Sequence, residues 1–120
     1  MGARLLGIAV SGILFAAAPM AAQEYPNKVI TMVVPFTAGG PTDTVGRLIA
    51  VPMTKMLKQQ VIVENVDGAG GTIAAYRVAK VTPDGYTILI HHIGMSTAPG
   101  LYRKLPYKPL EDFEHIGLIN

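Results

Sequence analysis

Val29-Ile30-Thr31-Met32-Val33-Val34 is an apolar run rich in β-branched residues, and Pro35 stops it. Such a run predicts a short, buried strand of a parallel sheet. The next residues, 36–41, contain two glycines and a proline and therefore predict a turn. Thr42 or Asp43 is then expected to cap a helix. A strand, a glycine-rich turn and a helix in this order begin a β-α-β unit.

The same order of elements repeats along the chain. Apolar residues recur at helical spacing as far as residue 57, and we expect Pro52 to kink this first helix or split it near Val51. The alternation implies an α/β fold with a mostly parallel sheet flanked by helices. The elements expected after the first helix are a strand at 61–64, a loop at 65–71, a helix at 72–81, a turn at 83–85, a strand at 86–90, a loop at 91–97, one helical turn at 98–101 and a strand at 113–119.

The first 22 residues resemble a secretory signal rather than part of the fold. Arg4 is the only charged side chain among them, and residues 5–18 are almost continuously apolar. This apolar stretch is shorter than the roughly 20 residues that a membrane-spanning helix needs. We expect a signal peptide over 1–22 that is cleaved after Ala22. Cleavage after Ala18 and an uncleaved anchor are the alternatives.

Composition excludes some classes of function. Ten Lys and Arg residues stand against eight Asp and Glu residues, and the formal net charge is +2. No basic cluster is present, so we expect no nucleic-acid partner. Without cysteine, an exported chain must be stabilised by apolar burial rather than by disulfides.

Three loops follow the carboxyl ends of predicted strands, where open α/β sheets bind ligands. Paired glycines at 39–40 and 70–71 let backbone N–H groups point towards one place, and each loop opens a helix. This pattern predicts a site for a small anion. The alternative is that the glycines only form tight turns.

A carboxylate fits the second loop better than a nucleotide does. The stretch Gly68-Ala69-Gly70-Gly71-Thr72 has Ile73 where the dinucleotide fingerprint needs a third glycine. It also has no lysine before Thr72, so it is not a phosphate-binding P-loop.

Catalytic and metal-binding residues do not form a set. Ser96 is the only serine after the predicted signal peptide and lacks a nucleophile-elbow context. Asp43 is a helix cap more readily than a base. His91 and His92 would point to opposite faces of a strand, so we expect no metal site and no cofactor.

The motifs read together resemble the tripartite tricarboxylate transporter solute-binding family, the Bug-type periplasmic binding proteins. The match runs from Tyr25 to the last residue. The motifs that carry it are Tyr25-Pro26, residues 33–43, Val63-Glu64-Asn65, residues 68–71, Pro83-Asp84-Gly85-Tyr86-Thr87, residues 101–107 and Asp112-Phe113.

The resemblance implies a periplasmic protein with type II binding-protein architecture that is not an enzyme. Two α/β lobes would close on a small organic carboxylate, and the protein, a monomer when full length, would deliver it to a membrane permease. Backbone amides of the loops would hold the ligand. The ligand-binding residues implied are Phe36, Thr37, Ala38, Gly39, Gly40, Thr42, Gly70, Gly71, Thr72, Gly94, Ser96 and Thr97.

Three features depart from the family pattern. Pro52 interrupts a helix that is usually continuous, and residues 91–95 occupy a loop where small residues are common. Family members are also much longer, so we interpret 23–120 as the N-terminal part of the first lobe, with the second lobe absent. This chain alone is then expected to bind weakly or not at all. The alternatives are a small exported α/β hydrolase-like enzyme and a non-functional truncated remnant.

Overall fold

The computed structural model describes residues 24–119, so the predicted signal peptide lies outside the described residues. In chain order the elements are β1 (Ile30–Val34), α1 (Pro41–Leu57), β2 (Val61–Asn65), the short 3-10 helix η1 (Ala69–Gly71), α2 (Thr72–Lys80), β3 (Thr87–Leu89) and α3 (Gly94–Leu101). Within this part of the chain, no helix combines the length and apolar character that crossing a bilayer requires.

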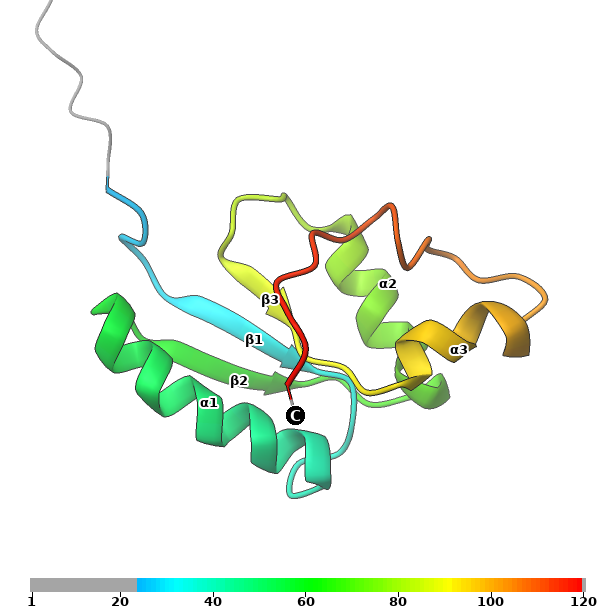
Figure 1. Cartoon of the computed structure of the whole chain (residues 1–120), viewed down its shortest axis with the longest axis horizontal. Helices are drawn as coiled ribbons and strands as arrows, with labels where there is room; N and C mark the ends of the chain where they lie inside the picture. Colours follow the sequence, from blue (N-terminus) through cyan, green and yellow to red (C-terminus); the bar gives the residue numbers. More distant parts are fainter. Residues whose placement is uncertain (1–23, 120) are drawn as a thin grey trace, which may run out of the picture.

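The three strands form one parallel sheet in the order β2-β1-β3, with β1 in the centre. Ile30 of β1 lies opposite Val61 of β2, and Thr31 lies opposite Thr87 of β3. Figure 1 shows α1 on one side of the sheet and α2 on the other. This arrangement confirms the predicted α/β class with a parallel sheet flanked by helices.

The central strand is apolar apart from Thr31 because helices cover both of its faces. Ile30 and Met32 pack with Ala50 of α1 on one face. Val33 packs with Ala74 and its neighbours from α2 on the other face. Successive side chains of a strand point to opposite faces, so one short run supplies both layers of the core.

Helix α1 begins two or three residues earlier than the sequence predicts. Gly40 is its N-cap, in an extended conformation, and Pro41 takes the first helical position. Proline fits there because its backbone angle is already helical and its missing N–H would have had no partner. The expectation that Thr42 or Asp43 caps the helix is therefore wrong.

The expectation that Pro52 splits α1 is also wrong, because one helix runs from Pro41 to Leu57. Proline removes the hydrogen bond to the carbonyl four residues earlier, that of Leu48. Leu48 lies on an exposed turn with 69% of its surface accessible. Water can therefore replace the lost donor, and the surrounding core contacts keep the helix continuous.

Two further elements, both near the C-terminal end, differ from the sequence prediction. Residues 94–97, expected in a loop, form the first turn of α3. Gly94 and Pro99 obscured this helix, since both residues usually mark turns. The strand expected at 113–119 is absent from the described sheet, although Phe113 packs against the Val33 cluster. A strand needs a neighbour that pairs with its N–H and C=O groups, and this segment has no ladder partner among the described strands.

Gly46 lets α1 approach the sheet closely. A Cβ atom added at this position would lie 3.2 Å from Val34 Cγ2 and 3.4 Å from Met32 Sδ. Both neighbours are buried side chains of β1. The glycine is thus a packing residue of the helix–sheet interface.

We predict that Gly46→Leu lowers the free energy of unfolding by about 2 kcal/mol, because the larger side chain overpacks the interface. Urea unfolding followed by far-UV circular dichroism measures the change. Gly100→Ala is the matched control, since a Cβ atom at that helical position meets nothing within 4 Å. Equal stability of Gly46→Leu and the unsubstituted chain would contradict the packing role.

Candidate functional site

The three predicted loops meet at the carboxyl ends of the strands. Thr37 Oγ1 of the first loop donates a hydrogen bond of 2.9 Å to Asp67 of the second. The Phe36 ring contacts the rings of His91 and His92, which follow β3. Parallel strands bring their loops to one edge of the sheet, and these contacts join all three loops there.

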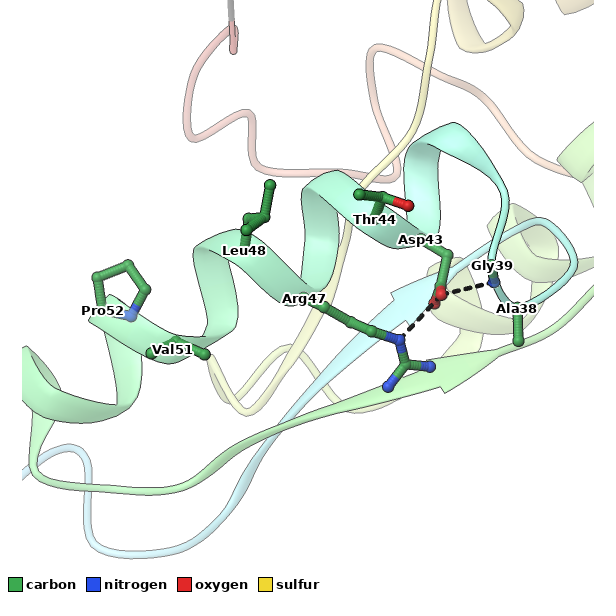
Figure 2. A pocket seen from close by; sticks show the side chains of 8 residues that line it. All are labelled: Ala38, Gly39, Asp43, Thr44, Arg47, Leu48, Val51 and Pro52. Carbon is green, nitrogen blue, oxygen red and sulfur yellow. Dashed lines mark hydrogen bonds and ion pairs between the residues drawn. The ribbon is translucent and has the colours of Figure 1, made fainter.

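A buried carboxylate organises the first loop. Asp43, in the first turn of α1, has only 2% of its surface exposed. Its Oδ2 accepts hydrogen bonds from the Gly39 N–H at 2.8 Å and from Arg47 Nε at 2.9 Å (Figure 2). Its Oδ1 accepts a third bond from Asn65 Nδ2 at 2.9 Å. Three donors therefore compensate one buried charge.

These donors also change the acidity of Asp43. The hydrogen bond from Arg47 holds the pKa of this carboxyl well below its ordinary value of 3.8, and the Gly39 N–H and Asn65 act in the same direction. Burial opposes the shift but is outweighed. Asp43 is consequently a structural anion rather than a base, because a base at neutral pH needs a much higher pKa.

Asn65 joins the end of β2 to the loop after β1. Besides Asp43, its Nδ2 donates to the Phe36 carbonyl at 2.9 Å. Its Oδ1 accepts from Arg47 Nη2 at 3.1 Å. Reasoning from the residues assigned no role to Asn65 or Arg47. The sequence offered one signal for Asn65, an amide side chain at the carboxyl end of β2.

The first loop contains a defined turn. The Gly40 N–H donates to the Thr37 carbonyl at 3.2 Å, and Gly39 has φ +86°. Ala38 has no positive φ, so the turn is type II with Ala38 at its second position and Gly39 at its third. The third position of this turn requires the left-handed conformation that glycine supplies.

Many of the predicted amide donors already have acceptors within the protein. In the second loop, the Gly71 N–H donates to the Gly68 carbonyl and the Thr72 N–H to Ala69. Together with the bonds of the first loop, the donors so engaged are Gly39, Gly40, Gly71, Thr72, Gly94, Ser96 and Thr97. In the described part of the chain, the N–H groups of Thr37, Ala38, Thr42 and Gly70 donate to no protein atom.

The third group of predicted residues lies on α3 rather than in a loop. Gly94 donates to His92 Nδ1 at 2.7 Å, and the Thr97 hydroxyl lies 3.4 Å from the Gly94 carbonyl. The end of α3 nevertheless contacts the second loop, since Tyr102 Oη donates to the Ala69 carbonyl at 3.0 Å. Helix α3 thus supports the second loop from one side.

The two adjacent histidines lie closer together than expected. They follow β3, as the loop predicted at 91–97 requires, but their rings do not diverge and make an edge contact with centroids 5.1 Å apart. Burial lowers the pKa of His91, and its Nε2 is buried beside Gly71 with no hydrogen-bond partner among residues 24–119. Groups of three or more metal-ligating side chains do not occur in that range.

A shallow groove of about 750 Å³ runs along the outer face of α1 (Figure 2). It shares the first loop with the candidate site but includes no residue of the other two loops. It is therefore a feature of the outer surface of the helix. Its lining residues are Ala38, Gly39, Asp43, Thr44, Arg47, Leu48, Val51 and Pro52.

We predict that Asp43→Asn lowers the melting temperature at pH 7 by about 5 °C or more. Since the folded-state pKa is depressed, the ionised carboxylate stabilises the fold above pH 3.8, and this contribution is lost as the pH falls below that value. The difference from the unsubstituted chain should thus shrink at pH 3 in thermal melts. Glu114→Gln, at an exposed carboxylate, is the control. A pH-independent difference would contradict this assignment.

Comparison with known proteins agrees with this geometry. The family model described as the tripartite tricarboxylate transporter family receptor matches residues 45–120. A UPF0065 protein from the TAR-I ttuE-ttuC' intergenic region of Agrobacterium vitis is 47% identical over 99% of this chain and 34% of its own length. The chain therefore spans about a third of that relative.

Two solved structures are similar to the described fold. The periplasmic binding protein BugD is 53% identical, with a TM-score of 0.73 over 75% of this chain and 30% of its own. MatC from Rhodopseudomonas palustris, solved with bound malate, is 51% identical, with a TM-score of 0.72 over 74% of this chain and 31% of its own. These are binding proteins rather than enzymes, in agreement with the sequence prediction. The chain belongs to the tripartite tricarboxylate transporter receptor family, whose members include the Bug-type periplasmic binding proteins.

Proposed function

We propose that residues 23–120 are the N-terminal part of the first lobe of a periplasmic solute-binding protein. The lobe contributes uncharged backbone N–H groups to a site for a small organic carboxylate. The N–H groups of Thr37, Ala38 and Thr42 in the first loop, and that of Gly70 in the second, are the donors. The residues around them would shape the loops, and a second lobe would complete the site.

The observation that carries this proposal is the set of unpaired donors at the meeting point of the loops. Most neighbouring amides are bonded within the protein, whereas these four are not. Thr37, Ala38 and Gly70 are exposed and Thr42 is half-buried, so these N–H groups are open to an acceptor from outside the protein. The malate in the related MatC structure is an acceptor of this class.

Transport would follow from binding. A signal peptide over residues 1–22 would export the protein to the periplasm, where the loaded full-length monomer would deliver its ligand to the membrane permease of a tripartite tricarboxylate transporter. Membership of the receptor family supports this role. Because the chain spans about a third of its relatives, both lobes would be needed for tight binding.

We predict that Ala38→Pro lowers the affinity for malate about tenfold or more, because a hydrogen bond to a charged group contributes roughly 1.5–3 kcal/mol. Proline suits the second position of a type II turn, so the substitution removes one N–H and keeps the turn. The measurement is isothermal titration calorimetry on a chimera in which residues 24–119 replace the matching part of BugD.

Ala38→Ser is the matched control, since it changes the side chain and retains the N–H donor. Far-UV circular dichroism and the melting temperature should be unchanged in both variants. Malate affinity equal in Ala38→Pro and Ala38→Ser would contradict the role of this amide. A chimera that binds no carboxylate while remaining folded would contradict the proposed function itself.

A further inference from the structure

The three loops of the candidate site contain no lysine or arginine. Asp67 is the one acidic residue in these loops, which span residues 36–42, 65–72 and 91–97. It accepts a hydrogen bond from Thr37. Arg47 lies nearby but is committed to Asp43 and Asn65. The side-chain donors that the three loops themselves supply are therefore uncharged, and the imidazoles after β3 are the strongest candidates among them.

His92 is held in a fixed position at this edge. Its ring stacks on Phe36 with centroids 4.4 Å apart and an interplanar angle of 21°. The Gly94 N–H donates to its Nδ1 at 2.7 Å. Ring stacking and a short hydrogen bond together restrict both the position and the rotation of an otherwise exposed side chain.

The same hydrogen bond sets the tautomer of His92. An N–H donor at 2.7 Å requires Nδ1 to be the acceptor, so the neutral ring carries its proton on Nε2. Within residues 24–119 no protein atom accepts a hydrogen bond from this Nε2. His92 therefore presents one free N–H donor close to Phe36, the residue that begins the first loop.

His91 cannot take this role. Its Nδ1 accepts the His92 backbone N–H at 3.0 Å, and its Nε2 is buried against Gly71. It supports the turn from which His92 projects, but its free nitrogen is closed to solvent. The two adjacent histidines therefore differ in access, and only His92 offers an accessible donor.

We propose that His92 is a specificity-determining residue whose Nε2–H binds a second carboxylate of the ligand, so that this lobe selects dicarboxylates over monocarboxylates. This inference rests on the proposed function, in which backbone amides of the first loop hold the first carboxylate. Phe36, which stacks on the His92 ring and directly precedes Thr37 in the chain, would contact the apolar part of the ligand.

Succinate and butyrate test the proposal, because both have four carbons and differ in the second carboxylate. Affinities are measured by calorimetry on the BugD chimera that carries residues 24–119. We expect His92→Phe, which keeps an aromatic ring on Phe36 and loses the donor, to weaken succinate about tenfold. Butyrate affinity should stay within twofold. His92→Gln, which restores an N–H donor, should recover part of the succinate affinity.

The measurements distinguish a failure of the His92 role from a failure of the proposed function. His115→Phe is the control, at an exposed histidine whose Nε2 contacts the Pro109 carbonyl. Equal losses for succinate and butyrate in His92→Phe, or no loss for either, would overturn the role of His92 while leaving carboxylate binding intact. A folded chimera that binds neither ligand before substitution would overturn the proposed function and this inference together.

Discussion

The fold near the candidate site depends on compensating one buried carboxylate. Asp43 is almost fully buried, and a buried charge is tolerated only when it is paired and hydrogen-bonded. Its three donors come from the first loop, from α1 and from the end of β2. These three hydrogen bonds fix the path of the chain between β1 and α1 and connect it to β2. Asn65 extends the constraint to the Phe36 carbonyl, so the loop is held at both ends.

This compensation determines what the first loop can offer a ligand. The Gly39 N–H and the Arg47 Nε–H donate to Asp43, so the most obvious glycine amide is engaged and the charge of the nearest cation is already paired. What remains is a small group of uncharged donors. Such donors bind an anion through the geometry of their hydrogen bonds rather than through net charge. Folding already holds them in place, so ligand binding loses less conformational entropy. In the proposed function, these donors would favour small carboxylates that fit their pattern.

The sheet places these donors by simple geometry. Three parallel strands end at one edge, and apolar helix contacts on both faces of β1 hold their alignment. Gly46 allows α1 to lie close to Val34, which brings the start of the helix to the edge where the loops meet. In the proposed function, the strands described here would provide one wall of a site that a second lobe completes.

The sequence by itself determined the order of strands and main helices from β1 to β3 and the α/β class, because β-branched runs, glycine pairs and helical spacing are local signals. It also indicated the three loops at the strand ends. Tertiary structure decided which amides are free, since that depends on acceptors such as Asp43, which takes the Gly39 N–H. Asn65, which is distant in sequence, donates to Asp43 and so helps to hold this acceptor in place. It likewise decided that Pro52 stays within a continuous helix and that residues 113–119 form no strand, because both outcomes depend on solvent access and on neighbouring backbone rather than on local propensity.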